Sequence, residues 1–316
     1  MARAQPAAEP TVLRMAAIAP EGTSWARELK AFARNLERST DGAVRVKWYL
    51  GGVAGDEAEE VERIKRDQLD GGAGAMICDI LAPSLAVTRV GGLLHSRAEA
   101  SRVVNQLTPT IAEEFQRKGF VFLGAAGFGL DVVFSRTPVR SLADLRRGRF
   151  WIRKYDDVLR STLTAIGMQI VELPYSEATR AYNEGRIDGF IATPASALAF
   201  QWAALARSYT DVKMAYLPGC MTIATRAFDK LPFAHQQAVR QEAAALAARF
   251  EDVGRELDHQ LLDQIYPRNG LVRVVPSPEF QRGLDAALLE ARGKIDPKLV
   301  SPALLTKTLR ALPPPK

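Results

Sequence analysis

Residues 150–192, FWIRKYDDVLRSTLTAIGMQIVELPYSEATRAYNEGRIDGFIA, carry the pattern that decides the fold. Three short apolar segments begin, divide and end this stretch, and two amphipathic segments lie between them. Gly167 and Gly185 follow the amphipathic segments, where a glycine commonly ends a helix. A strand–helix–strand–helix–strand order favours parallel strands in one sheet with helices on its faces. The stretch therefore predicts an α/β fold.

The same alternation extends toward both ends of the chain. Its apolar segments predict strands at residues 12–19, 44–48, 73–81, 120–123, 132–134, 150–152, 169–173, 187–192, 209–217 and 221–225. An Ala/Leu-rich segment over residues 233–265 predicts one helix of roughly thirty residues, unusually long for a globular domain. Two sheets fit this length, with the chain crossing between them near residues 125–131 and 217–226.

The composition is that of a globular chain of about two domains. Hydrophobic residues make up 47% and charged residues 25% of the 316 residues, close to globular averages, and about 150 residues make one domain. No stretch approaches the ~18 apolar residues of a membrane-spanning helix. The net charge of +6 is too small an excess to indicate a nucleic-acid partner.

The sequence contains no pattern typical of an active site or a metal site. His95, His235 and His259 are isolated, and no GxSxG or HExxH motif occurs. The glycine-rich segments 71–74 and 124–129 lack the strand-then-helix setting of a dinucleotide fingerprint, so we expect turns or hinges there. We therefore expect no enzyme activity, no metal and no cofactor.

The two cysteines, Cys78 and Cys220, form no CxxC pair, so neither a zinc site nor a redox dithiol is indicated. Their separation leaves two alternatives, a single disulfide or two thiols. The sequence does not choose between them.

An acidic cluster occupies residues 56–62. Glu59 and Glu62 precede Arg63 and Arg66 by four residues each, and such pairs stabilise exposed helix surfaces. We expect a solvated helix face here rather than a pair of catalytic carboxylates.

A basic segment, residues 146–154 (RRGRFWIRK), holds five basic and two aromatic residues. This mixture can bind single-stranded nucleic acid, but Phe150 and Ile152 alternate as in a buried strand, so we expect no nucleic-acid site. Arg153 lies at the carboxyl end of that strand, where ligands bind in open α/β sheets. A guanidinium can hold a carboxylate with two hydrogen bonds, which makes Arg153 a candidate ligand anchor.

Several ordered segments together resemble the substrate-binding subunit (DctP-type) of TRAP (tripartite ATP-independent periplasmic) transporters. The resemblance extends over nearly the whole chain, from about residue 12 to residue 304. The matching segments are LRMA and PEGTSW at residues 13–16 and 20–25, GAVRVK at 42–47, GDE at 55–57, PVRSLADLR at 138–146, LPYSE at 173–177, EGRIDG at 184–189 and FDKLP at 228–232.

The resemblance implies a two-lobe periplasmic-binding-protein-like fold with a mixed sheet in each lobe, hinge-crossing strands and a long domain-spanning helix. Lobe I would contain residues 11–130 and about 218–265, and lobe II residues 131–217. Residues 1–10 would form a flexible N-terminus, and residues 266–316 C-terminal helices and a Pro-rich tail. The lobes would close on a small organic ligand by hinge motion.

The resemblance also implies the setting in which the protein works. The loaded protein would deliver its ligand to the membrane permease subunits of a TRAP-type transporter. A periplasmic location rests on the resemblance alone, because we recognise no export signal in this chain.

The chain departs from the family pattern at the polar ligand contacts. The match assigns the family's ligand-binding arginine to Arg153. A second family arginine is expected within residues 127–131 (GFGLD), which contain none, and Phe190 stands where an asparagine usually follows the Asp-Gly turn. We therefore expect a less polar ligand than a dicarboxylate or sugar acid: a monocarboxylate with an apolar or aromatic body, or a lipid-like molecule.

Such pockets are mostly apolar, with few polar anchors. With Arg153 as the anchor, the other expected ligand-binding residues are a threonine that follows a predicted strand and six aromatic residues: Thr193, Trp25, Phe128, Trp151, Tyr155, Phe190 and Trp202.

Two other classes of function stay open. A ligand-sensing or accessory protein on the same fold, including a lipid-binding one, would dock a partner other than a permease. An enzyme on a doubly wound fold would need a clustered base and nucleophile, which the sequence does not offer.

Overall fold

The computed structural model describes residues 9–313, which form two compact units with a mixed sheet in each. Among the described residues, unit 1 comprises 9–81, 112–125 and 219–250, and unit 2 comprises 82–111, 126–218 and 251–313. Two mixed sheets with covering helices confirm the predicted fold class.

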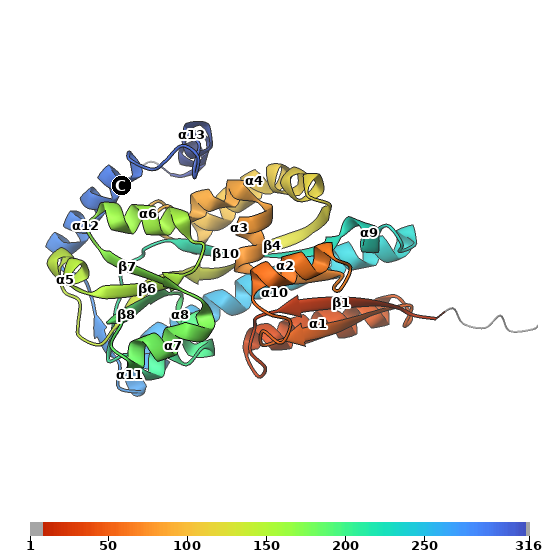
Figure 1. Ribbon diagram of the computed structural model, residues 1–316, viewed down its shortest axis with the longest axis horizontal. Helices are drawn as coiled ribbons and strands as arrows, with labels where there is room; N and C mark the ends of the chain where they lie inside the picture. Colours follow the sequence, from red (N-terminus) through yellow and green to blue (C-terminus); the bar gives the residue numbers. More distant parts are fainter. Residues whose placement is uncertain (1–8, 314–316) are drawn as a thin grey trace, which may run out of the picture. The chain divides into compact units, whose positions relative to one another are not determined.

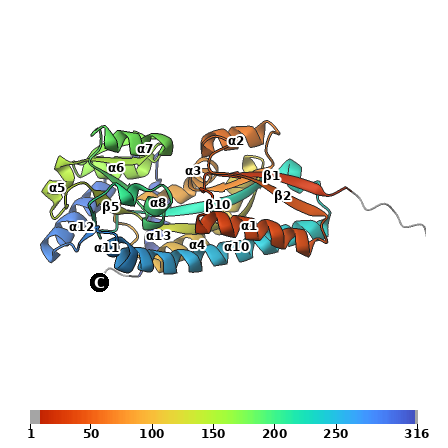
Figure 2. The ribbon, with the colours of Figure 1, turned by 90° about the horizontal axis from the view of Figure 1, so that it is seen from below.

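Unit 1 has a five-stranded sheet in the order β2-β1-β3-β10-β4. Its elements, some of which continue into unit 2, are β1 (Thr11–Ala17), α1 (Ser24–Ser39), β2 (Val44–Leu50), α2 (Glu57–Lys65), β3 (Gly71–Gly74), α3 (Ala75–Leu81), α4 (Arg97–Arg117), β4 (Phe120–Leu130), β10 (Tyr216–Ala224), α9 (Thr225–Phe228) and α10 (Phe233–Gln260). Strand β1 is parallel to β2 and β3, whereas β10 is antiparallel to β3. Figure 2 shows α1 beside the unit-1 part of α10, where Glu28 and Arg249 form an ion pair at 2.8 Å.

The glycines of β3 allow its neighbours to approach closely. A Cβ atom on Gly71 would lie 2.3 Å from the carbonyl oxygen of Thr222 in β10. A side chain at this position would therefore push β10 away from β3.

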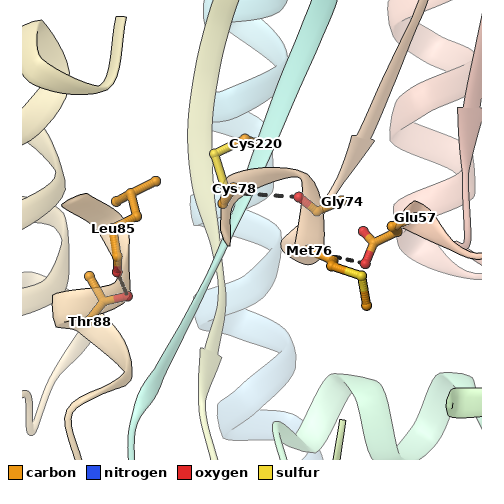
Figure 3. Close-up of a disulfide and its surroundings, with 7 residues drawn as sticks. All are labelled: Glu57, Gly74, Met76, Cys78, Leu85, Thr88 and Cys220. Atoms are coloured by element: carbon orange, nitrogen blue, oxygen red, sulfur yellow. Dashed lines mark hydrogen bonds between the residues drawn. A yellow bond between two sulfur atoms is a disulfide. The ribbon is translucent and has the colours of Figure 1, made fainter. Parts of the chain in front are cut away.

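A disulfide links Cys78 of α3 to Cys220 of β10, with the two Cα atoms 5.2 Å apart (Figure 3). This finding decides between the two alternatives that the sequence left open. The strand expected over residues 73–81 is wrong, since β3 ends at Gly74 and α3 begins at Ala75. A short apolar run can be a buried strand or a buried helix, and periodicity alone does not separate them.

Two carboxylates of the acidic cluster are buried, so the expected solvated face is wrong for them. Glu57 and Glu60 in α2 are 1% and 0% exposed. One oxygen of Glu57 accepts the backbone N–H of Met76 at 3.0 Å (Figure 3), and a Cβ on Gly74 would lie only 1.4 Å from the other. The carboxyl oxygens of Glu60 have no hydrogen-bond partner among the described residues. Burial, with a smaller contribution from Glu57, raises the pKa of Glu60 to about 9.

Unit 2 has a six-stranded sheet in the order β11-β9-β5-β8-β6-β7. Its remaining elements are the 3₁₀ helix η1 (Pro83–Arg89), β5 (Val132–Ser135), α5 (Leu142–Arg147), β6 (Arg149–Arg153), α6 (Asp157–Ala165), β7 (Gln169–Leu173), α7 (Tyr175–Asn183), β8 (Gly189–Ala192), α8 (Pro194–Ala199), the 3₁₀ helix η2 (Trp202–Ala204), β9 (Ser208–Thr210), the π-helix η3 (Leu261–Ile265), α11 (Tyr266–Arg268), β11 (Val272–Val274), α12 (Pro278–Arg292) and α13 (Pro302–Ala311).

Alternating side chains on this sheet build two different cores. Phe150 and Ile152 of β6 face a cluster of aliphatic residues from α5, α6 and α12. Trp151, between them, contacts the aromatic residues of the opposite face, among them Phe190 of β8. In the view of Figure 1, α6 lies above strands β7, β6 and β8, and α7 lies below them.

Four elements, α4, β4, β10 and α10, contribute residues to both units. Strand β4 continues through residues 124–129, where a turn or hinge was expected, and two of its glycines have a positive φ (Gly124 +153° and Gly129 +129°). The other glycine-rich segment, residues 71–74, was also expected to be a turn or hinge and forms β3. The long helix begins at Phe233 as predicted, and η3 and α11 follow it directly.

The boundaries of the two units differ from the boundaries expected for the two lobes. Residues 82–111, 126–130 and 251–265 belong to unit 2, whereas the sequence placed them in lobe I. The C-terminal helices α12 and α13 also belong to unit 2. Most of the N-terminus expected to be flexible, and the last residues of the Pro-rich tail, lie outside the described residues. Within residues 9–313, no helix is both long and apolar enough to cross a membrane.

Replacing both cysteines, Cys78→Ala with Cys220→Ala, is expected to lower the free energy of unfolding by about 3–5 kcal/mol. The disulfide joins residues 142 positions apart, and a link of this span restricts the unfolded chain strongly. Urea unfolding of the oxidised protein and the double variant measures the difference. A reductant should destabilise the wild type and leave the variant unchanged; equal stabilities would contradict the prediction.

Glu60→Gln is expected to remove a pH dependence of stability. Because the pKa of Glu60 in the folded state lies above its unfolded value of 4.5, stability is greatest below that value and falls as the pH rises toward about 9. The slope is at most about 1.4 kcal/mol per pH unit. Urea unfolding between about pH 5 and pH 8 should show a flatter profile for Glu60→Gln than for the wild type.

The matched control for this prediction is Glu113→Gln, which changes an exposed glutamate of α4. It should keep the wild-type slope. A wild-type profile that does not fall with pH, or the same slope in Glu60→Gln, would rule out the buried carboxyl as its origin.

Candidate ligand-binding site

A small pocket lies on the aromatic face of the unit-2 sheet, at the carboxyl ends of β6 and β8. It is lined by twelve residues from η1, β6, β8, β10, α7, α8, η2 and the connection between β4 and β5: Arg89, Asp131, Trp151, Ile152, Arg153, Tyr175, Ile191, Ala192, Thr193, Ser196, Trp202 and Leu217. Its free volume is about 10 Å³, which is room for about one water-sized group. The pocket can therefore receive one polar group of a ligand rather than a whole solute.

Four charged side chains, each only 2–4% exposed, form a cluster beside this pocket. Arg89 Nη2 lies 2.6 Å from Asp156 Oδ2 and 2.7 Å from Asp131 Oδ2. Arg89 Nε donates a further hydrogen bond to Asp156 Oδ2 at 2.9 Å. Arg153 Nε lies 3.3 Å from the same oxygen. Two arginines and two aspartates give the cluster a formal charge of zero.

The two aspartates differ in their electrostatics. Burial alone would raise the pKa of Asp156, but Arg153 and Arg89 lower it below the usual range. For Asp131 burial prevails over the attraction of Arg89 and raises the pKa. Burial opposes the charge of Arg89, yet Asp131 and Asp156 raise the pKa of its guanidinium, which stays cationic.

Two groups beside the cluster could meet a ligand. Arg89 Nη1 is buried and has no hydrogen-bond partner among the described residues. Thr193 caps α8, because its hydroxyl accepts the N–H of Ser196 at 3.1 Å, and the two hydroxyls lie 2.8 Å apart. The pocket thus presents a guanidinium and hydroxyl groups to an entering oxygen atom.

Three aromatic residues, Trp151, Tyr175 and Trp202, form part of the pocket wall. The rings of Trp151 and Trp202 are 4.5 Å apart between centroids, and Tyr175 stacks on Trp202 at 5.9 Å. Trp151 Nε1 donates a hydrogen bond to the carbonyl of Leu173 at 3.0 Å, which satisfies its polar atom. Trp151 is inclined by 60° to Trp202, and the three rings together offer an apolar surface at the pocket.

The structure brings four of the predicted site residues together at this pocket: Arg153, Trp151, Thr193 and Trp202. Phe190 is fully buried behind Trp202, with its ring stacked at 5.2 Å, and does not line the pocket. The role of these five residues in ligand binding stays a prediction.

The other three predicted residues lie elsewhere. Trp25 is buried in unit 1 in the first turn of α1. Phe128, in β4, is half-buried, and its carbonyl accepts a hydrogen bond from Arg97. Tyr155 is half-exposed and has a φ of +67°. This left-handed turn lies between Arg153 and Asp156, whose side chains meet across it.

Sequence reasoning missed several residues of the site: Arg89, Asp131, Asp156, Tyr175 and Ser196. Asp131 stands in the segment where the family arginine was sought, and Asp156 follows Arg153 by three positions. Arg89 ends a 3₁₀ helix without any periodic pattern, so only its burial against two aspartates reveals it. Within the described part of the chain, no group of three or more His, Cys, Asp or Glu side chains is placed to hold a metal ion.

Comparison with known proteins places the chain in one family of solute-binding proteins. The family model DctP, bacterial extracellular solute-binding protein, family 7, matches residues 15–291. A solute-binding protein of Verminephrobacter eiseniae is 24% identical over 254 residues, which cover 78% of this chain and 75% of that protein.

Two solved structures share the fold over 95% or more of both chains. An extracytoplasmic solute receptor of Bordetella pertussis that binds pyroglutamic acid has a TM-score of 0.84 and 21% identity, over 95% of this chain and 99% of that one. A TRAP periplasmic solute-binding protein of Haemophilus influenzae with bound L-gulonate has a TM-score of 0.86 and 16% identity, over 96% of this chain and 100% of that one.

Asp156→Ala is expected to lower the free energy of unfolding by about 3–5 kcal/mol, because it removes one of the two buried aspartates that balance the charges of Arg89 and Arg153. The matched control is Asp157→Ala, which removes the adjacent, half-exposed carboxylate and its pairing with Arg160 and should cost less than about 1 kcal/mol. Urea unfolding measures both. Similar losses in the two variants would show that the buried cluster does not stabilise unit 2.

Proposed function

Because the chain belongs to the DctP family of bacterial extracellular solute-binding proteins, we propose that it captures a monocarboxylate with an apolar or aromatic body and delivers it to a TRAP-type membrane permease. The family match covers most of the chain and confirms the resemblance found in the sequence. Members of this family bind small organic solutes for transport. The class of solute and the permease are the parts that we propose.

The observation that carries the proposal is the pocket of unit 2. Arg153 and Arg89 line it together with Trp151 and Trp202. A guanidinium binds a carboxylate through charge-assisted hydrogen bonds, and the rings favour an apolar neighbour. The small free volume suits one oxygen atom of a carboxylate, with the rest of the solute lying outside the pocket against the aromatic side chains.

The acids bound by the two solved relatives support an anionic solute. Pyroglutamic acid and L-gulonate both carry a single carboxyl group. Around that group we expect an apolar solute body, because the indole rings of Trp151 and Trp202 line the present pocket.

We also propose a periplasmic location for the working protein. The family consists of extracellular solute-binding proteins. The disulfide between Cys78 and Cys220 agrees with this, since such bonds form and persist in oxidising compartments.

Calorimetry with a panel of solutes tests the proposal. The panel contains 4-methylpentanoate, 3-phenylpropanoate, pyroglutamate, galactonate, succinate and octanoate, each titrated into the purified protein. We expect the branched and aromatic monocarboxylates to bind most tightly. Preferential binding of succinate or galactonate would overturn the proposed solute class, and binding of octanoate alone would favour a lipid carrier.

Arg153→Lys is expected to weaken binding of the tightest panel solute at least tenfold, which corresponds to about 1.4 kcal/mol. Lysine keeps the charge but loses the planar fork of the guanidinium. Arg149→Lys, on the same strand β6 with a side chain that is 44% exposed and paired with Asp188, is the matched control and should bind as the wild type does. Equal affinities for Arg153→Lys and the wild type would show that the guanidinium of Arg153 does not bind the solute.

A further inference from the structure

We propose that Arg89 is a second anion-binding residue of the unit-2 pocket, contacting the solute carboxylate through Nη1, and that Asp131 takes up a proton when this carboxylate binds. The inference rests on the proposed function, because it assumes that the pocket receives the solute. It adds a ligand-binding residue, Arg89, and a proton uptake on binding, neither of which the sequence or the family match indicates.

The first argument is the arrangement of donors on Arg89. Nε and Nη2 are engaged by Asp156 and Asp131 at 2.6–2.9 Å. Nη1 is buried without a hydrogen-bond partner among the described residues, and Arg89 lines the pocket. A buried donor left without an acceptor is costly, and an entering carboxylate oxygen would supply that acceptor.

The second argument is preorganisation. Arg89 ends η1, and two aspartates pair with its guanidinium. Asp131 lies in the β4–β5 connection, and Asp156 immediately precedes α6. The planar fork is thereby fixed before a solute arrives, so little side-chain freedom is lost on binding.

The third argument is the charge balance of the cluster. Arg89 and Arg153 already neutralise Asp131 and Asp156, so an added carboxylate would leave one uncompensated negative charge in a buried site. Such a charge is costly. A proton taken from solvent onto one aspartate restores the balance.

Asp131 is the better proton acceptor of the two aspartates. Asp156 accepts two hydrogen bonds from Arg89 and also lies beside Arg153, contacts that favour its charged form. Asp131 lines the pocket itself, and burial raises the pKa of its carboxyl. The charged groups acting on Asp131 are Arg89 from η1, Arg153 from β6 and Asp156 from the turn before α6.

Formate, the smallest carboxylate, is the probe for this site because it reports on the pocket without requiring the correct solute body. Titration of ¹³C-formate into the full chain, followed by NMR, gives a dissociation constant at each pH between about 5 and 8. In the wild type we expect the affinity to fall as the pH rises, by at most about tenfold per unit, because binding takes up one proton.

Asp131→Asn should bind formate more tightly than the wild type at about pH 8 and show no such pH dependence. The charge-balanced double variant Arg89→Met with Asp131→Asn should lose affinity at least tenfold. Its control, Arg160→Met with Glu172→Gln, removes another ion pair of unit 2, at 3.0 Å, and should bind formate as the wild type does.

Three results would overturn the inference: no formate binding by the wild type, wild-type affinity in the Arg89 double variant, or an unchanged pH profile in Asp131→Asn. Failure of the proposed function gives a different result. Formate binding that depends on Arg89, with no binding of any panel solute, would refute the solute class alone. Panel solutes that bind the Arg89 double variant normally would refute the assignment of Arg89 alone.

Discussion

A buried pairing of two arginines with two aspartates is the constraint on which the candidate site depends. Arg89, Asp131 and the neighbouring pair Arg153 and Asp156 come from three separate places in the sequence. None of these charges could be buried alone at reasonable cost. Their mutual contacts therefore fix where η1, β6 and the start of α6 meet within unit 2. Removing one member affects both the stability of the unit and the pocket that it forms.

The site combines this polar end with a continuous aromatic wall. Alternation along β6 sends Phe150 and Ile152 into the aliphatic core and turns Trp151 and Arg153 toward the pocket, which Ile152 also lines in part. One strand thus supplies both the packing that holds the sheet and the side chains that could meet a solute. A register shift of one residue would exchange these two sets completely.

Unit 1 depends on a different set of close contacts. Gly71 and Gly74 leave room for β10 and for the buried carboxyl group of Glu57, while a disulfide ties α3 to β10. The same region carries Glu60, whose buried carboxyl group costs stability as the pH rises. This cost has no evident structural compensation among the described residues.

The strand and helix pattern made most of the fold predictable from the sequence. Residues 150–192 form the three strands and two helices that their periodicity indicates, and Arg153 lies at the pocket as its strand-end position suggested. Periodicity failed where a run is short and apolar throughout, as in α3, and where charges are buried, as at Glu57 and Glu60. Arg89 and Asp131 were beyond reach because their pairing spans distant segments and leaves no local signal.

The central claim is that the pocket of unit 2 receives the carboxylate of the solute. A crystal structure of the protein grown with 3-phenylpropanoate tests it most directly. The account predicts the carboxylate within hydrogen-bond distance of Arg89 and Arg153, about 3 Å, with the phenyl ring against Trp202. A carboxylate bound away from both arginines, with only water in the pocket, would contradict it.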